Sequence, residues 1–353
     1  MPSYSIVIPF YAQTIKQVLQ LKECLTHLQK CDGIEEAETM VIDDASPMPP
    51  SIIENAIKHF NIRYLRLLKN SGPGVARNEG AKESLGHILL FMDHDCLPPS
   101  QWLKILTAPI LENKCQATTA TYIGTANQKW LTNYQFYDFK YRTLSKEHLV
   151  DFLHGCSCAI ERSTFFKCGG FPEVRCYEDQ LFGKRLVQNG NKVLYLPLGG
   201  VVHHFRSNLK EYLKQQFRFG ESIAYYSLLT SFSLEKIFLK FKKREKEYYR
   251  KSFVNTQLSI VLTFMVYLSL TLFFLSPWYR LVYLEIALIL IGAILLAHTH
   301  FIILLFKKKK SFWTVISYFP LMILLQSVYL CASLSAIAKI CLPRTWVNKM
   351  HTL

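Results

Sequence analysis

The stretch that decides the fold is residues 87–95, which read His-Ile-Leu-Leu-Phe-Met-Asp-His-Asp. Its centre, Ile88–Met92, is a short apolar run bounded by polar residues, a pattern typical of a buried strand. The strand ends in Asp93-His94-Asp95, so two carboxylates follow its last apolar residue. In open α/β sheets, ligands bind beyond the carboxyl ends of the strands. The polar residues just after each predicted strand are therefore the candidates for a functional site.

Three further segments predict strands of the same sheet: Ser5–Pro9, Thr39–Asp43 and Arg63–Leu68. Between the predicted strands, apolar residues recur at helical spacing around residues 15–28, 52–60 and 75–85. Strands that alternate with helices form a mostly parallel sheet covered by helices on both faces. We therefore expect an α/β, Rossmann-like domain over residues 1–235.

The net charge of +15 is not spread evenly over the 353 residues. Residues 1–235 carry 25 basic and 23 acidic side chains, whereas residues 236–251 carry eight basic side chains against Glu245 and Glu247. A nucleic-acid-binding protein needs its basic surface on the folded domain, where it can follow the phosphates. The charge distribution therefore argues against a nucleic-acid partner.

The cysteines and the N-terminus indicate a cytoplasmic domain. Ten cysteines are scattered without a C-x-x-C motif, and no basic segment followed by an apolar run of signal length opens the chain. We therefore expect reduced thiols. Cys156, Cys158, Cys168 and Cys176 lie close in sequence, but their irregular spacing favours free thiols over a zinc site.

Three long apolar runs follow the soluble part, at residues 258–276, 281–306 and 312–340. About 20 apolar residues span a bilayer as a helix, so three transmembrane helices are expected. The segment 236–257 is then a basic amphipathic juxtamembrane segment, and 342–353 is a short tail.

The basic residues also predict the orientation in the membrane. If residues 236–251 are cytoplasmic, two crossings return Lys307–Lys310 to the cytoplasm, in agreement with the positive-inside tendency. This predicts an integral protein of a plasma or inner membrane, of bacterial type, with its soluble domain in the cytoplasm. Residues 236–251 either attract anionic lipid or only set this topology.

Paired carboxylates after a strand favour a hard divalent cation. Oxygen ligands such as those of Asp93 and Asp95 suit Mg²⁺ or Mn²⁺, which can bridge two phosphates. Residues 70–74, Asn-Ser-Gly-Pro-Gly, form a glycine-rich turn before a helix that carries Arg77. A phosphate could approach this turn and Arg77, although a plain strand-to-helix turn with a solvated arginine has the same sequence.

A second group of polar residues follows later in the chain. Glu178 and Asp179 precede a helix, where a carboxylate either interacts with the helix dipole or, as for Asp179, serves as a general base. His203 follows a further predicted strand and offers a third metal ligand, with Arg206 near the phosphates. A histidine at such a position can equally be structural.

The order of these motifs resembles family-2 glycosyltransferases of the GT-A fold over about residues 3–220. The matching segments are Ser5–Pro9, Val41–Ser46, Asn70–Gly80, Asp93–Asp95, Gly169–Phe171, Glu178–Asp179 and Val202–His203. The resemblance implies inverting, metal-dependent transfer of a sugar from a nucleotide-sugar, with a UDP-sugar favoured.

The resemblance also implies a role for each matching residue. Asp179 is implied as the catalytic base and Asp95 as a ligand of the Mn²⁺ or Mg²⁺, with His203 as a further ligand of the metal or a contact of the phosphates. On the donor side the implied residues are Pro9 and Asp44 beside the base, Asp93 near the ribose, and Gly74 and Arg77 near the phosphates. On the acceptor and sugar side the resemblance implies Gly155 and Gly170, and we also assign Glu178, Arg206 and Arg218 to this side.

Two departures from related enzymes narrow the function. Polyprenyl-phosphate sugar synthases typically extend the metal motif with Leu-Gln-Asp, whereas this chain continues with Cys96-Leu97-Pro98. Residues 215–219, Gln-Gln-Phe-Arg-Phe, resemble the Q-x-x-R-W signature of processive synthases, with Phe219 in place of tryptophan. Three crossings are too few for a polymer channel, so Arg218 is interpreted as a phosphate or acceptor contact on an amphipathic helix.

The leading hypothesis is therefore a non-processive glycosyltransferase that acts on a membrane-proximal acceptor, such as a lipid-linked glycan or a glycolipid of the cell envelope. The alternatives are a polyprenyl-phosphate sugar synthase and a non-catalytic membrane scaffold with a nucleotide-binding fold. Nucleotidyl transfer would favour a glycine-rich loop after the first strand, where this chain has Phe10-Tyr11-Ala12-Gln13. A transporter is disfavoured because the polar motifs lie outside the apolar runs.

Overall fold

A computed structural model of the chain describes residues 2–141, 146–174, 176–231, 261–274, 280–298, 302, 303, 306 and 311–341. The chain divides into two compact units. The N-terminal unit comprises Met1–Phe136 and Thr143–Phe205, and the C-terminal unit comprises Tyr137–Arg142 and Arg206–Leu353. The division falls before the boundary expected at residue 235, because the helix that begins at Leu209 groups with the C-terminal helices.

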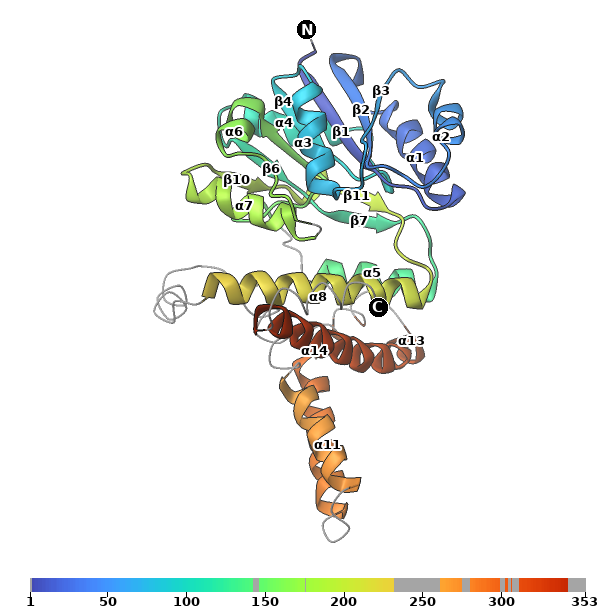
Figure 1. Cartoon of the computed structure of the whole chain (residues 1–353), viewed down its shortest axis with the longest axis vertical. Helices are drawn as coiled ribbons and strands as arrows, with labels where there is room; N and C mark the ends of the chain where they lie inside the picture. Colours follow the sequence, from blue (N-terminus) through green and yellow to red (C-terminus); the bar gives the residue numbers. More distant parts are fainter. Residues whose placement is uncertain are drawn as a thin grey trace. The chain divides into compact units, whose positions relative to one another are not determined.

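The N-terminal unit is built on an eight-stranded sheet (Figure 1). Its strands, in spatial order, are β3 (Arg63–Arg66), β2 (Ala37–Asp43), β1 (Tyr4–Phe10), β4 (Ile88–Phe91), β9 (Cys158–Glu161), β6 (Ala117–Thr119), β10 (Val193–Tyr195) and β8 (His148–Val150). The first four pair in parallel, and β9 runs antiparallel to both β4 and β6. The predicted mostly parallel α/β sheet is thus confirmed.

Helices cover both faces of this sheet. Successive side chains of β1 point to opposite faces and therefore pack against different helices. Ile6 and Ile8 pack in one core with α1 (Ile15–Leu28), α2 (Pro50–Ile57) and α4 (Trp102–Leu111). Val7 packs in a second core with α3 (Pro73–Glu83), α6 (Arg162–Lys167) and α7 (Glu178–Gln188). Because both faces are buried, β1 is apolar along nearly its whole length, as the sequence pattern indicated.

A small second sheet lies beyond the end of β4. Its strands are β5 (Cys96–Leu97), β11 (Val201–His203) and β7 (Tyr122–Thr125), with β11 in the middle. β5 and β11 are antiparallel, and Cys96 pairs with His203. This pairing brings the acidic segment after β4 next to a segment more than a hundred residues later.

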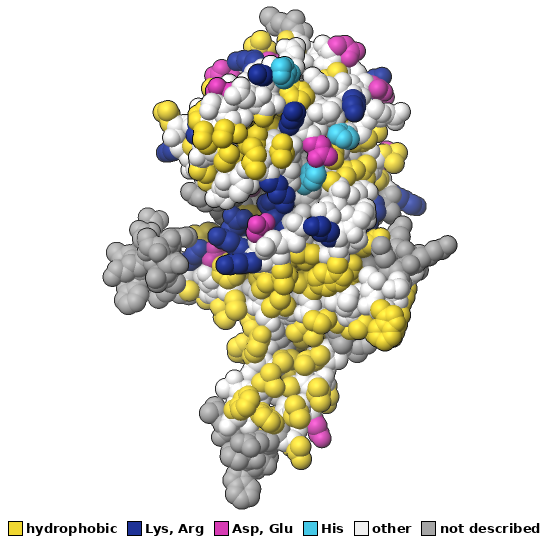
Figure 2. Space-filling model, turned by 90° about the vertical axis from the view of Figure 1, so that its right-hand side faces the viewer, with side chains coloured by type: hydrophobic (Ala, Val, Ile, Leu, Met, Phe, Trp, Pro, Cys, Tyr) yellow, Lys and Arg dark blue, Asp and Glu magenta, His cyan; other side chains and the backbone are white. Residues whose placement is uncertain are grey.

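The C-terminal unit consists of helices: α8 (Leu209–Ser231), the helix Val261–Phe274, α11 (Arg280–Ala297), α13 (Phe312–Ser317) and α14 (Phe319–Cys341). Hydrophobic side chains dominate the lower part of Figure 2, which these helices form. Within the described residues, one stretch, Phe312–Lys339, is long and apolar enough to cross a membrane. The other two predicted crossings contain shorter apolar helices, so their number stays a prediction. The predicted segments 236–257 and 342–353 lie outside the described residues.

Candidate active site

Asp95 and His203 form the metal-binding candidate of the N-terminal unit. Oδ1 of Asp95 lies 3.4 Å from Nε2 of His203, and both side chains are about nine-tenths buried. Two ligands of one octahedral ion, each about 2.1 Å from it, lie about 3 Å apart. The two side chains therefore fit a shared Mg²⁺ or Mn²⁺ without rearrangement.

Aromatic rings hold His203 in this orientation. Its imidazole stacks on Tyr122 with ring centroids 4.4 Å apart, and Phe205 meets it edge-on at 4.5 Å. Nδ1 of His203 is buried and has no hydrogen-bond partner among the described residues. Because the ring is packed on two sides, Nε2 stays directed at Asp95.

Cys96 is the third potential ligand, since its Sγ and the ligand atoms of Asp95 and His203 all lie within 4.8 Å of one another. Burial and the neighbouring Asp95 raise the pKa of Cys96 well above its usual range. A neutral thiol is a poor ligand for a hard cation. Asp95 and His203 are therefore the better donors. In the part of the chain that the structure describes, Cys156, Cys158, Cys168 and Cys176 are free thiols.

Arg77 connects the acidic segment after β4 with the start of α7. Nη2 of Arg77 lies 2.6 Å from Oδ1 of Asp93, and Nη1 lies 2.6 Å from Oε1 of Glu178. The arginine side chain is only 3% exposed. Burial alone would lower the pKa of Arg77, but Asp93, Glu178 and Asp179 raise it above its ordinary value. Arg77 is therefore a fixed cation that neutralises several carboxylates at once.

Gly155 makes room for this arginine. A Cβ atom at residue 155 would lie 2.6 Å from Nη2 of Arg77, closer than side chains tolerate. The N–H of Gly155 also donates a hydrogen bond of 2.9 Å to Oδ2 of Asp179. A single glycine thus contacts both the buried cation and the predicted base.

Asp179 sits in the first turn of α7 and is partly exposed. Burial, followed by the charge of Glu178, raises its pKa to about 7, although the N–H of Gly155 and the charge of Arg77 act in the opposite direction. A carboxylate with a pKa near neutrality can accept a proton and still be largely ionised at physiological pH. This property suits the predicted general base.

Asp44 organises the glycine-rich turn before α3. Its carboxylate accepts hydrogen bonds of 2.8 Å from the N–H groups of Ser71 and Gly72, and one of 3.1 Å from Asn70. The role of Asp44 beside a nucleotide base stays a prediction, as does that of Pro9, which is buried in β1.

Asp43, which the sequence analysis did not select as a site residue, is fully buried and accepts hydrogen bonds from Tyr64 and Arg66. The sequence of β2 does not indicate that Asp43 is buried in an ion pair, because its partner Arg66 belongs to another strand, β3. Its pairing with Arg66 at 2.8 Å makes Asp43 part of the scaffold under Asp44.

Gly74 and Gly170 both lie where other segments approach closely. A Cβ at Gly74 would lie 2.9 Å from the carbonyl oxygen of Pro172, and one at Gly170, where φ is +63°, would lie 2.7 Å from Oδ1 of Asn78. Asn78 itself exchanges two hydrogen bonds with the backbone of Phe171. These glycines therefore allow α3 to pack closely against the segment before α7. Their predicted contacts with the donor and the acceptor stay predictions.

Arg206 and Arg218 belong to the C-terminal unit. Their predicted roles beside the phosphates or the acceptor stay predictions.

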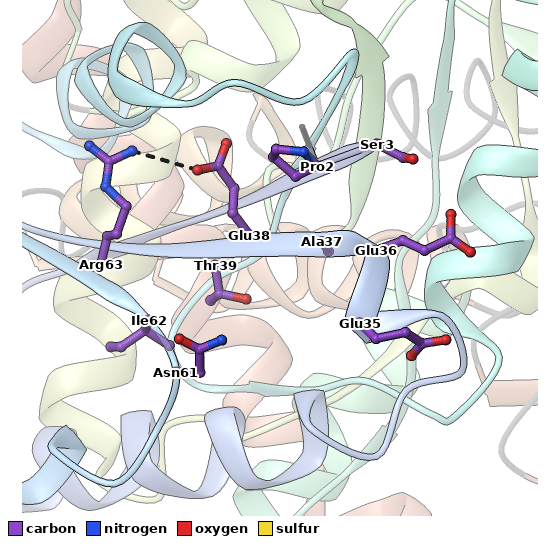
Figure 3. A pocket seen from close by; sticks show the side chains of 10 residues that line it. All are labelled: Pro2, Ser3, Glu35, Glu36, Ala37, Glu38, Thr39, Asn61, Ile62 and Arg63. Atoms are coloured by element: carbon purple, nitrogen blue, oxygen red, sulfur yellow. Dashed lines mark ion pairs between the residues drawn. The ribbon is translucent and has the colours of Figure 1, made fainter.

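A hollow of about 560 Å³ lies elsewhere on the N-terminal unit (Figure 3). It is formed at the amino ends of β1, β2 and β3, the opposite edge of the sheet from the acidic residues. Its most buried carboxylate, Glu38, already accepts a hydrogen bond of 2.6 Å from Ser5 and pairs with Arg63 at 3.5 Å. This hollow is not a candidate for the site.

The fold is that of GT-A glycosyltransferases. Residues 5–168 match the model of the family Glycosyl transferase family 2, and the N-terminal unit accordingly contains a family-2 glycosyltransferase domain.

Three proteins illustrate the similarity. The chain is 24% identical over 197 residues to the pre-mycofactocin glycosyltransferase of Mycobacterium tuberculosis, which covers 52% of this chain and 41% of that protein. It is 24% identical over 250 residues to glycosyltransferase AglE of Haloferax volcanii, covering 67% of this chain and 78% of AglE. The mannosyltransferase PcManGT of Pyrobaculum calidifontis, solved with GDP-Man and Mn²⁺, shares the fold at a TM-score of 0.55 and 14% identity, over 95% of this chain and 87% of that one. The chain thus spans less than half of the mycobacterial relative.

Proposed function

We propose that this chain is an inverting, metal-dependent glycosyltransferase that uses a nucleotide-sugar. One observation carries the proposal: buried Arg77 ties Asp93, two residues before the metal-binding candidate Asp95, to Glu178, the neighbour of Asp179. In the proposed mechanism, these contacts of Arg77 fix the donor-binding segment relative to the residue next to the proton acceptor. Such positioning accounts for much of the rate of a two-substrate reaction.

The proposed reaction needs one base. Oδ of ionised Asp179 accepts the proton of the acceptor hydroxyl while that oxygen attacks the anomeric carbon from the face opposite the leaving group. The new glycosidic bond forms as the bond from the anomeric carbon to the diphosphate oxygen breaks, and the diphosphate keeps the electron pair. Asp95 and His203 would hold a divalent cation, which when bound would offset the negative charge of the leaving diphosphate.

The donor is proposed to be a UDP-sugar. Pro9 and Asp44 are assigned to the base, Asp93 to the ribose, and Gly74 and Arg77 to the vicinity of the phosphates. The structure of PcManGT with GDP-Man and Mn²⁺ supports the use of a nucleotide-sugar and a metal on this fold, and makes GDP-sugars the first competitors to compare.

The acceptor is proposed to be membrane-associated, such as a lipid-linked glycan or a glycolipid. The apolar helices of the C-terminal unit and the basic segments 236–251 and 307–310 support attachment to a bilayer. An enzyme fixed to the bilayer meets lipid-linked acceptors at high effective concentration.

Release of nucleoside diphosphate tests the proposal. The full-length protein, supplied with membrane lipids and Mn²⁺ or Mg²⁺, is expected to release UDP from at least one UDP-sugar, and the Asp179→Asn variant is expected not to. The exposed Asp32, whose side chain is 45% accessible, provides the control Asp32→Asn, which should release UDP at the unaltered rate. If no common UDP-sugar or GDP-sugar gives release, the proposed activity is wrong.

A further inference from the structure

The helix α14 is apolar and long enough to cross a bilayer, yet its C-terminal half is fixed to α8. Figure 1 shows α8 and α14 side by side, and the two helices contact each other. The hydroxyl of Tyr329 donates to Oε1 of Gln216 at 2.6 Å, and Lys339 pairs with Glu221 at 2.8 Å. Higher residue numbers on α8 therefore match higher residue numbers on α14, and the two helices run in the same direction.

Close packing accompanies these polar contacts. Gly220 of α8 faces Tyr329 and Ala332 of α14, and a Cβ at Gly220 would lie 3.0 Å and 3.1 Å from their side chains. Ser335 adds a hydrogen bond of 2.5 Å to Glu221. The contacts run from Gln216 to Glu221 on α8 and from Tyr329 to Lys339 on α14, so the C-terminal half of α14 lies beside the middle of α8.

The charges of α8 exclude this helix from the hydrocarbon core. Lys210, Lys214 and Arg218 recur every four residues on α8, and all three are exposed, as is Glu211. Charged side chains within a bilayer are costly unless they are paired or reach water. A helix with basic side chains along one face lies at the membrane surface, where these side chains reach headgroups and water. Because α14 runs along α8, α14 must lie in the same plane.

We infer that α8 and α14 form a two-helix platform in the headgroup region of the bilayer, and that α14 does not cross it. This inference rests on the membrane attachment proposed above. Apolar side chains of α14 remain exposed, with Leu334 at 52% and Ile337 at 45%, and they provide the surface that acyl chains cover. Trp313 of α13, 76% exposed and next to the lysines 307–310, is an aromatic anchor of the kind found at membrane interfaces.

The inserted part is then the pair formed by the helix Val261–Phe274 and α11. Ser269 donates a hydrogen bond of 2.6 Å to the carbonyl oxygen of Tyr283, which ties these two helices together. Their apolar side chains are widely exposed, with Phe274 at 74%, Leu281 at 76% and Ile289 at 70%. The apolar runs that contain them, 258–276 and 281–306, are each long enough to cross a bilayer, and two crossings return the chain to the side on which it entered.

The charge of the C-terminal tail agrees with this arrangement. Arg344 and Lys349 follow α14, and no acidic residue accompanies them. With two crossings, these residues lie on the same side as the basic segments 236–251 and 307–310, as the positive-inside tendency favours. With three crossings they would lie on the opposite side from both basic segments.

Epitope tags in the full-length chain decide between the two topologies. One tag is inserted at residue 278, between the two inserted helices, and another is added after Leu353. In spheroplasts of a bacterial host, antibody is expected to reach the tag at 278 without permeabilisation, and to reach the C-terminal tag only after permeabilisation. If antibody binds the C-terminal tag on intact spheroplasts, the chain makes a third crossing and the inferred platform is wrong.

Two further outcomes separate this inference from the proposed function. One outcome is that antibody reaches neither tag on intact spheroplasts, while extraction with alkaline carbonate leaves the protein in the membrane. The inserted pair of helices then does not cross the bilayer, and the inferred platform is wrong. If alkaline carbonate releases the protein from the membrane, the proposed membrane attachment is wrong, and so is the platform that depends on it. Release of UDP in the assay above is measured separately, so the sugar-transfer proposal can survive either result.

Discussion

Nη1 of Arg77 lies 2.6 Å from Oε1 of Glu178, a contact between helices α3 and α7, which begin about a hundred residues apart in the chain. The pair is buried, and the second terminal nitrogen of the same guanidinium contacts Asp93. The planar fork of arginine can serve two carboxylates at once, which the single ammonium of lysine does less well. This pairing makes the acidic cluster electrostatically tolerable before any metal or substrate binds.

Arg77→Lys is expected to destabilise the fold. Loss of one partner leaves a buried carboxylate without its counter-ion, which costs about 3 kcal/mol or more of unfolding free energy. Chemical denaturation followed by circular dichroism measures this change. The control is Arg63→Lys, because Arg63 is 51% exposed and its ion pairs lie at the surface, where they contribute about 0–1 kcal/mol. Equal effects of the two substitutions would contradict the role assigned to Arg77.

Asp179→Asn and Asp95→Asn are expected to separate chemistry from binding. Removal of a general base lowers kcat by about 10²–10⁴-fold while the donor still binds. Removal of a metal ligand instead weakens binding of the nucleotide-sugar that depends on Mn²⁺. Isothermal titration calorimetry and single-turnover rates measure both effects, and an equal loss of donor affinity in the two variants would refute the assignments.

Activity is expected to fall as the pH drops below about 7. The base must be ionised, and burial raises the pKa of Asp179 to about 7, so the active fraction decreases as protons bind. Glu178→Gln removes a negative charge that raises this pKa, and it frees Arg77 to lower the pKa further. The acid limb of the kcat/KM profile should therefore move to lower pH in this variant. A limb that stays in place would show that another group controls the profile.

His203→Ala is expected to weaken Mn²⁺ binding by at least about tenfold, because it removes one of two ligands that lie 3.4 Å apart. The adjacent His204 provides a matched control. Its Nε2 contacts Glu23 at 2.9 Å, so His204→Ala should leave the affinity for Mn²⁺ nearly unchanged. Electron paramagnetic resonance of free Mn²⁺ in a titration measures both affinities, and similar losses would place the metal elsewhere.

Gly220→Leu is expected to separate α14 from α8, since even a Cβ at residue 220 would crowd Tyr329 and Ala332. Limited proteolysis of the protein in membranes should then cut near α14 at lower protease concentration. Gly292→Leu in α11 is the control, because a Cβ there meets no atom within 4 Å. If both variants are cut alike, the packing between α8 and α14 does not hold α14 in place.

Local sequence patterns were sufficient to predict the parallel part of the sheet. Ser5–Pro9 and Ile88–Met92 are apolar on both faces, as strands covered by helices must be, and the acidic residues follow them directly. The resemblance of the motifs to family-2 glycosyltransferases supplied the site residues in their chain order.

Contacts between distant segments were not predictable in this way. The two-residue strand β5 has no periodicity to detect, and nothing in the sequence near Arg77 indicates that Glu178 will neutralise it. Gly155 looks like any turn residue until the arginine beside it is located. The length of α14 predicts a membrane span, whereas its partner α8 determines the orientation inferred for it.

The pairing of β5 with β11 makes the metal-binding candidate dependent on register. The two strands meet through two residue pairs, Leu97 with Val202 and Cys96 with His203, beside an irregularity between Val201 and Val202. Successive side chains of a strand point to opposite faces, so a slip of one residue would turn His203 away from Asp95. A single inserted residue between Gly200 and His203 would thus abolish the metal site while every ligand remained in the sequence. Some relatives keep the acidic motif and the equivalent of His203 but differ in the number of residues between Gly200 and His203. We expect these relatives to differ in metal use.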